Sequence, residues 1–283
     1  MAEYFTARGL PVPRELTRSP LTDWRRNAIL ALVILTIVVG LRITNIDLTY
    51  TNPEYAGRQI AQLFNWDTRI LTPQNEFETF ADTAEGKMIE TIFLAIIATV
   101  FSIVLAIPLS FLGARNIMAG HPVTVAIYTA VRLIFTVVRS IDVLIVVIVM
   151  AILFGIGNAA GVFGLAFHNL GVLGKLYSEA IEGIDNGPVE AITATGANRF
   201  QVIWTAVLPQ IANPYISFTI YRLDANVRLA PILGYVGGGG IGYMLFQSIN
   251  LFNYRAAGLI IFMIIVTVAL MDFLSAQVRR RLA

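Results

Sequence analysis

Long apolar runs separated by short polar connections make up most of this chain. A transmembrane helix needs about 20 mainly apolar residues, because the hydrocarbon core is about 30 Å thick and each residue rises about 1.5 Å. The stretches that approach or exceed this length are 27–46, 88–112, 142–157, 159–181, 211–233 and 256–275. The pattern therefore predicts an all-α membrane protein with about six transmembrane helices.

Composition agrees with this interpretation and narrows the function classes. Hydrophobic residues make up 57% of the 283 residues and charged residues only 13%, whereas a soluble domain carries about 25% charged residues. A net charge of +2 is too small to indicate a nucleic-acid partner. The absence of cysteine excludes disulfides and thiolate chemistry. The first apolar run lacks a small-residue cleavage site after it, so we interpret it as a retained span.

Arginine placement indicates which side of the membrane each connection faces. Six spans put both termini on one side, and cytoplasmic connections carry an excess of Lys and Arg. The connection 47–86 holds seven acids against Arg58 and Arg69, so we expect it outside the cell. We expect a multi-pass protein of the cell inner or plasma membrane with both termini in the cytoplasm. The arginines behind this prediction are Arg8, Arg14, Arg18, Arg25 and Arg26 in the N-terminal tail, Arg115, Arg132 and Arg139 in the 113–140 connection, and Arg279, Arg280 and Arg281 at the C-terminus.

A further apolar stretch, 124–138, complicates the count of spans. As a seventh span it would put the termini on opposite sides, so we expect a helix lying at the cytoplasmic interface. No internal repeat is evident. We therefore expect a cytoplasmic tail at 1–26, an extra N-terminal transmembrane helix at 27–46, an extracytoplasmic loop at 47–87, and a membrane core at 88–283 that includes a cytoplasmic segment at 183–209.

The segment 183–209 has the local chemistry of two short helices. Residues 185–187 are typical of a turn, and Pro188 suits the first helical position. Glu190 then lies in the first turn, where the helix dipole favours a negative charge. Gly196 fits a helix end that requires a positive φ. The remaining signals are a capping-box restart at Asn198 and Gln201, a helix end at Leu208-Pro209, and the start of the next span at Asn213-Pro214.

A plain connecting loop is the alternative interpretation, but such loops are usually short and polar. The alanines at 191, 194 and 197 would instead leave a small, flat surface. The segment also resembles the pattern Glu-Ala-Ala-x3-Gly-x9-Ile-x-Leu-Pro of the membrane subunits of ABC importers. The positions that match are Glu190, Ala191, Gly196, Leu208 and Pro209, while Ile192 and Ala206 depart from the pattern.

This resemblance implies that 183–209 is a coupling helix segment, in which Ala197 belongs to the same surface and which docks in a groove of a cytoplasmic ATPase. The flanking stretches HNLGVLGKLYSEAIEGIDNGPVEA and NVRLAPILGYVGGGGIG resemble phosphonate-type permeases, which are similar to the methionine-type fold. The implied partners are a second copy of the chain, two ATPase subunits and an extracytoplasmic binding protein. The implied substrate is a phosphonate, a phosphate or a related oxyanion.

The chain contains no Gly-x4-Gly-Lys-Ser/Thr motif, so ATP would be bound by a partner and no cofactor is expected on this chain. Neither a nucleophile–base set, nor paired carboxylates, nor metal-ligand spacing occurs in a credible site. The pattern favours a transport subunit rather than an enzyme. An ion-coupled secondary transporter of a small anion is the alternative function. Such transporters more often have two related halves, which are not visible here.

The fifth apolar stretch carries the charged residues Arg222, Asp224 and Arg228. Ionisable groups within a span are costly and usually face the bundle interior or a water-filled path. Arg222 with Asn226, and Asp224 with Arg228, are i,i+4 pairs that share a face. Two interpretations stay open: a translocation path for an anion, or a structural ion pair between Asp224 and Arg228.

Two further features carry alternative interpretations. The glycines Gly237, Gly238, Gly239 and Gly240 adjoin this span, and three glycines of the region satisfy Gly-x-Gly-x-x-Gly. A dinucleotide site needs a strand before this motif, so we expect a break in the helix and a candidate gate. His168 and Asn169 are either polar contacts between helices or contacts to a substrate.

Overall fold

The computed structural model describes residues 8–9, 24–44, 53–74 and 78–282, and in these residues every regular element is helical. The predicted all-α fold is therefore confirmed. The chain divides into two units, 1–57 and 58–283. Four residues used in the orientation argument, Arg14, Arg18, Asp47 and Glu76, lie outside the described residues.

The first unit contains one long apolar helix, α3 (Trp24–Thr44). Its segment Arg26–Thr44 is long and apolar enough to cross a membrane, and none of that window is buried. Apolar side chains on every side are expected of a helix surrounded by lipid. The expected helix at 27–46 is thus present up to Thr44. Residues 45 and 46 lie outside the described residues.

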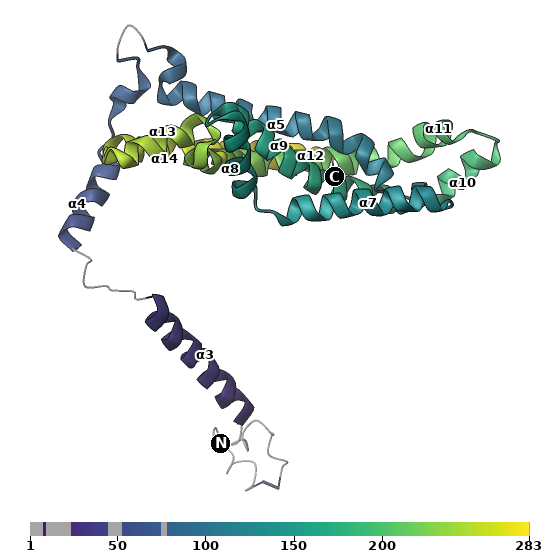
Figure 1. The fold of residues 1–283 in the computed structure, drawn as a ribbon, viewed down its shortest axis with the longest axis horizontal. Helices are drawn as coiled ribbons and strands as arrows, with labels where there is room; N and C mark the ends of the chain where they lie inside the picture. The colour runs from purple at the N-terminus through teal and green to yellow at the C-terminus, as the bar shows by residue number, and fades with distance from the viewer. Residues whose placement is uncertain (1–7, 10–23, 45–52, 75–77, 283) are drawn as a thin grey trace. The chain divides into compact units, whose positions relative to one another are not determined.

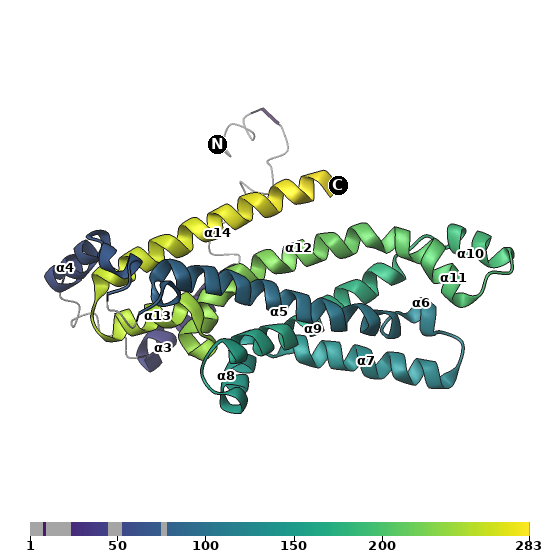
Figure 2. The same ribbon diagram turned by 90° about the horizontal axis from the view of Figure 1, so that it is seen from above.

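The second unit is a bundle of long helices that run side by side (Figures 1 and 2). Helix α9 packs against α5, α7 and α12, and α12 also packs against α5 and α14. These helices are α5 (Ala84–Leu112), α7 (Pro122–Ser140), α9 (Asn158–Glu182), α12 (Leu208–Leu233) and α14 (Tyr254–Leu282). The shorter helices are α4 (Pro53–Phe64), which crosses the boundary between the units, α6 (Arg115–Met118), α8 (Val143–Phe154), α10 (Asn186–Ala194), α11 (Arg199–Val202) and α13 (Gly240–Asn250).

Small residues on α9 allow the neighbouring helices to approach closely. A Cβ atom at Gly174 would lie 2.4 Å from the ring of Phe135, and one at Gly171 would lie 2.8 Å from Val138, both on α7. Gly164 makes the same kind of contact with Val147 on α8. Close helix packing over small residues is typical of membrane bundles, where dispersion contacts replace the hydrophobic effect between helices.

The third predicted span is wrong in its limits. The stretch 142–157 forms only a 12-residue helix, Val143–Phe154, which is shorter than the length that a span needs. The stretch 124–138 lies instead in the 19-residue helix Pro122–Ser140, which is long and apolar enough to cross. In the described residues five helices meet these criteria, or six if the bent pair formed by Arg199–Gly238 and α13 counts as one span. The number of candidate spans therefore agrees with the prediction of about six, with α7 counted by length and composition in place of 142–157. The expectation that 124–138 lies at the cytoplasmic interface stays a prediction.

Arg132 ties α7 to the ends of α5 and α9. Its Nε donates to the carbonyl oxygen of Gly113, where α5 ends, at 2.9 Å. Its Nη2 lies 2.5 Å from Oε2 of Glu182, where α9 ends. Residues 122–130 therefore extend beyond the ends of α5 and α9, while Val131 is buried and residues 132–140 pack against α9. One helix combines a part outside the core with a part inside it.

Candidate functional site

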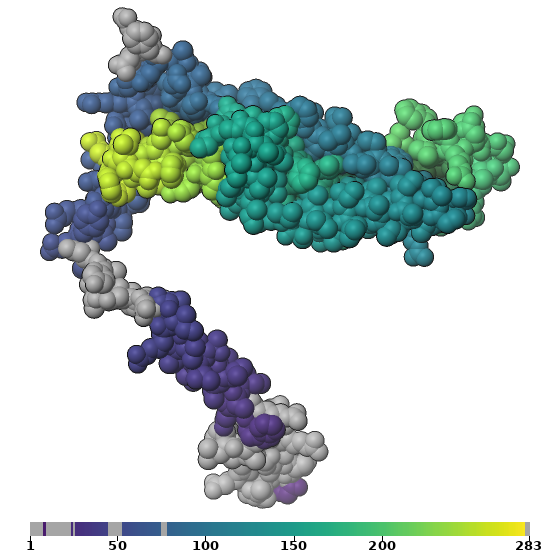
Figure 3. Space-filling view, viewed as in Figure 1, coloured from purple at the N-terminus to yellow at the C-terminus, as the bar shows by residue number. Residues whose placement is uncertain are grey.

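The segment 183–209 forms two short helices, as predicted, and they project at one end of the second unit (Figure 3). The carboxylate of Asp185 caps α10 by accepting a hydrogen bond from the Gly187 amide at 3.0 Å. Asn198 and Gln201 make the predicted capping box, with reciprocal bonds of 2.8 and 2.9 Å. Side-chain caps satisfy amides that a helix start leaves free, so this surface is locally rigid.

The residues predicted for coupling occupy this projection. Gly196 links the two helices with φ at +81°, which confirms the predicted conformation. An added Cβ there would meet nothing within 4 Å. Glycine is therefore favoured at this position by the positive φ and not by a lack of space. Glu190, Ala191, Gly196 and Pro209 are exposed, while Ala197 and Leu208 are half-buried.

The predicted helix end at Leu208-Pro209 is wrong, and so is the predicted start of the next span at Pro214. A π-helical segment, Ile203–Val207, joins α11 directly to α12, and Pro214 lies inside α12. The Leu208 amide donates to the carbonyl of Ile203, five residues earlier. A proline has no amide hydrogen and its ring crowds the preceding turn. The wider π turn accommodates Pro209 without ending the helix, and such turns are frequent at functional sites.

The base of the projection is attached to the bundle by polar contacts. The Asp185 amide donates to Oε1 of Gln210 at 2.9 Å, which ties the start of α10 to α12. The Asn116 side chain donates to the Ile181 carbonyl at 2.7 Å, which ties α6 to the end of α9. The first bond fixes the projecting helices to α12, and the second holds together the helix ends beside them.

A polar stripe runs along one face of α12, at Tyr215, Thr219, Arg222 and Asn226. Positions i, i+4, i+7 and i+11 lie on one face of a helix. The Tyr215 hydroxyl bonds Ser110 on α5 at 2.8 Å, and Thr219 bonds the Tyr177 hydroxyl on α9 at 2.6 Å. Further along the stripe, the Asn226 amide donates to Thr99 on α5 at 2.7 Å, and Arg222 Nε donates to Oδ1 of Asn169 on α9. Polar contacts therefore recur over several turns between α5, α9 and α12, beside buried apolar residues such as Leu173 and Ile211.

Arg228 lies on another face of α12 and contacts two carboxylates. It bonds Asp224 on its own helix, and its Nη2 lies 3.0 Å from Oδ1 of Asp272 on α14. The ion pair that the sequence suggested between Asp224 and Arg228 is thus present. Asp272 was missed, because nothing in the sequence indicates that α14 packs against this part of α12.

The glycine stretch breaks the helix, as predicted. Gly237, Gly239 and Gly240 have φ values of +108°, +77° and +67°, and the chain bends by 59° between α12 and α13. The Gly157 amide donates to the Gly237 carbonyl at 2.9 Å, so the break is held against the start of α9. Helices, not a strand, flank the stretch, which excludes the dinucleotide-binding interpretation.

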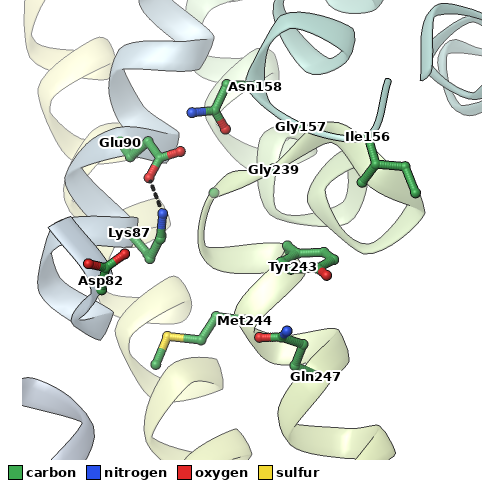
Figure 4. A pocket seen from close by; sticks show the side chains of 11 residues that line it. Asp82, Lys87, Glu90, Ile156, Gly157, Asn158, Gly239, Tyr243, Met244 and Gln247 are labelled. Atoms are coloured by element: carbon green, nitrogen blue, oxygen red, sulfur yellow. Dashed lines mark hydrogen bonds and ion pairs between the residues drawn. The ribbon is translucent and has the colours of Figure 1, made fainter. Parts of the chain in front are cut away.

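A cavity of about 680 Å³ lies beside the glycine break (Figure 4). Its polar lining includes the ion pair between Lys87 and Glu90, with 2.9 Å between Nζ and Oε2, together with Asn158. Asp82 lies at the edge of the cavity, before α5. Hydrogen bonds from the backbone amide and the hydroxyl of Thr79 lower the pKa of this carboxyl, which keeps it charged. The sequence did not indicate this cavity, because its residues come from separate elements.

Comparisons with known proteins agree with this arrangement. A phosphate-import permease protein, PhnE, of Mycolicibacterium smegmatis is 37% identical over 215 residues, which cover 76% of this chain and 39% of that protein. A phosphite transport system permease protein, PtxC, of Stutzerimonas stutzeri is 35% identical over 193 residues, which cover 68% of this chain and 69% of that protein. The chain therefore spans well under half of the first relative.

The fold is similar to that of the methionine ABC transporter MetNI in an inward-facing conformation. The TM-score is 0.60 at 22% identity, and the match covers 69% of this chain and 94% of the other. The family model for the binding-protein-dependent transport system inner membrane component matches residues 116–283, more than half of the chain. The chain belongs to the family of inner membrane components of binding-protein-dependent transport systems.

Proposed function

We propose that this chain is the membrane permease subunit of an ATP-driven importer of a phosphorus oxyanion, a phosphonate, a phosphate or phosphite. The observation that carries the proposal is the capped helix pair 186–202, which projects from the bundle and continues into α12. An element of this kind receives force from another protein. The substrate class is supported by the two relatives, which are a phosphate-import and a phosphite permease.

The complete transporter needs partners. Two copies of the chain enclose the translocation path, two cytoplasmic ATPase subunits bind ATP, and an extracytoplasmic binding protein delivers the oxyanion. Both termini and the segment 183–209 face the cytoplasm. The family name supports the binding protein and the membrane location. The chain itself carries no ATP site, which its lack of a P-loop motif supports.

Each group of predicted site residues has a role in this proposal. The exposed surface around Glu190, Ala191 and Gly196 docks on the ATPase, with Ala197, Leu208 and Pro209 supporting it from the base. The break at Gly237–Gly240 acts as the gate, which its bend and its contact with α9 support. Arg228 lies between the carboxylates of Asp224 on α12 and Asp272 on α14, so we assign it a role in holding α12 to α14.

Reconstitution tests this function. The chain is purified together with a cognate ATPase and binding protein and placed in proteoliposomes. We expect uptake of phosphite or a phosphonate that requires ATP, the ATPase and the binding protein together. Uptake driven by an ion gradient without the ATPase would instead establish the alternative, an ion-coupled secondary transporter of a small anion.

A further inference from the structure

We propose that Arg222 and Asn169 form an anion-binding site halfway along the bundle, which holds the oxyanion during its passage. This inference rests on the proposed function and identifies where in the permease the substrate charge is balanced. It also separates Arg222 from Arg228, which the sequence placed in the same candidate path.

Arg222 is a buried cation without a counter-charge. Its residue is 9% exposed, and its hydrogen-bond partner is the neutral amide of Asn169. Among the residues that the structure describes, no carboxylate lies within ion-pair distance of it. Arg228 is the opposite case, since two carboxylates surround it and its side chain is 49% exposed.

A buried charge of this kind is costly. Arginine at the centre of a transmembrane helix is among the least favourable residues there, and such residues usually face a partner or a water-filled path. A structural hydrogen bond to Asn169 would need only a neutral donor, so the bond does not account for the charge. A permanent cation facing no anion is suited to an anion that arrives from solution.

Unsatisfied donors point to the same ligand chemistry. Arg222 Nη2 and Asn169 Nδ2 are both buried, and neither has a hydrogen-bond partner among the described residues. They belong to two side chains that already bond each other, so the free donors lie at one place. Phosphite and phosphonate groups present several acceptor oxygens on one phosphorus atom, and guanidinium groups bind such oxygens in a planar, bidentate manner.

The site lies between the two moving parts of the proposed mechanism. Asn169 is 11 residues from the start of α9 and 13 from its end, which places it about 16–20 Å from either end. Arg222 stands between the coupling projection and the glycine break on the same helix, α12. In the packed arrangement described here the donors are enclosed, so an oxyanion reaches them when α9 and α12 separate during transport.

A cysteine one turn from Arg222 provides the test. The chain has no native cysteine, and Ala225 lies three residues from Arg222, on a neighbouring position of α12. The variant Ala225→Cys is reconstituted with its partners. Modification of the permease chain is followed during ATP turnover with an anionic and a cationic methanethiosulfonate reagent of similar size. We expect the anionic reagent to react several-fold faster, and added phosphite to slow it.

Three substitutions in the Ala225→Cys chain distinguish an effect of the Arg222 charge from an effect on helix packing. Arg222→Gln keeps a donor for Asn169 but removes the charge, so the preference for the anionic reagent and the protection by phosphite should both disappear. Arg222→Lys should keep the preference but lose part of the protection. Thr219→Val, one turn away on the same stripe, removes a neutral contact and should leave both unchanged. Uptake by Arg222→Gln should fall about tenfold or more, as expected for a lost hydrogen bond to a charged group.

Several results would overturn the site. They are equal rates with the two reagents, absence of any reaction at Ala225→Cys, or unchanged uptake in Arg222→Gln. A lower amount of assembled complex in Arg222→Gln, without a charge preference in the parent, would make Arg222 a packing residue. These results bear on the site only if the Ala225→Cys protein shows ATP-dependent uptake. Failure of that uptake would reject the proposed function instead.

Discussion

At Gly242, an added methyl group would lie 1.8 Å from the carbonyl oxygen of Pro231. This backbone atom cannot move without separating α12 from α13. We therefore predict that Gly242→Ala destabilises the bundle by about 1–3 kcal/mol, as expected for overpacking. The measurement is the unfolding temperature of the purified permease in detergent.

Gly183→Ala is the matched control, because its nearest neighbouring atom would be 3.5 Å away and its φ is −87°. The control should change the unfolding free energy by less than about 0.5 kcal/mol. Equal effects of the two substitutions would show that the close approach at Gly242 carries no stability.

The cluster of Asp224, Arg228 and Asp272 gives a second prediction at this scale. Arg228→Gln leaves two carboxylates facing each other, one of them with a side chain only 4% exposed. Breaking a fully buried pair costs about 3–5 kcal/mol. Arg228 and Asp272 are half-exposed, so we expect a smaller cost, seen as less assembled permease by size-exclusion chromatography. Asp224→Asn in the same chain should recover assembly and uptake. Full assembly of Arg228→Gln with lost uptake would place Arg228 in the path.

At the scale of elements, features that depend on neighbouring residues were predicted better than features that depend on tertiary contacts. The cap at Asn198, the positive φ at Gly196 and the glycine break each depend on a few neighbouring residues, and each is confirmed. The preference against helix before Pro209 is also a local rule, but the π-helical segment overrides it. The contact between Arg132 and Glu182, 50 residues further along the chain, was not predicted, because a single sequence does not show which helix ends meet.

The candidate site shows the same division. Tyr215, Thr219, Arg222 and Asn226 have the spacing of one helix face. This stripe can be found in the sequence, but it was missed because only the charged residues of the span and their i,i+4 partners were considered. The pairing of Arg222 with Asn169 spans 53 positions, and a single sequence does not indicate which face of α9 meets α12. Asp272 was invisible for the same reason.

The turn between α10 and α11 gives a prediction for one element. Gly196 has open space around it, so Gly196→Val acts through backbone strain at φ +81° and not through a clash. We expect the binding-protein-stimulated ATPase rate to fall while the permease still assembles. Asparagine tolerates this conformation better than other residues, so Gly196→Asn should retain more activity. Equal rates in both variants and the parent would mean that the turn takes no part in coupling.

At the scale of the whole molecule, orientation is open to direct labelling. Single cysteines are introduced at Glu78, His121 and Arg199, since the chain has none of its own. An impermeant thiol reagent should modify Glu78→Cys in intact cells. The other two should react only after permeabilisation. His121 adjoins the part of α7 that extends past the ends of α5 and α9, and Arg199 lies in the projecting helix α11, and we assign both to the cytoplasmic side. External labelling at Arg199→Cys would reverse the proposed orientation.

The π-helical junction also has a mechanical consequence. Because the helix does not end at Pro209, a single arm runs from Arg199 to Leu233, about 50 Å long at 1.5 Å per residue. A tilt of about 5° at one end of such an arm displaces the other by about 4 Å. The π-helical segment Ile203–Val207 is then the point where the arm can bend. Bending there would reduce the displacement that passes from α11 to the far end of α12. The stiffness of this segment, more than the affinity for the ATPase or for the substrate, would determine how much of a movement of the projecting helices reaches the glycine break.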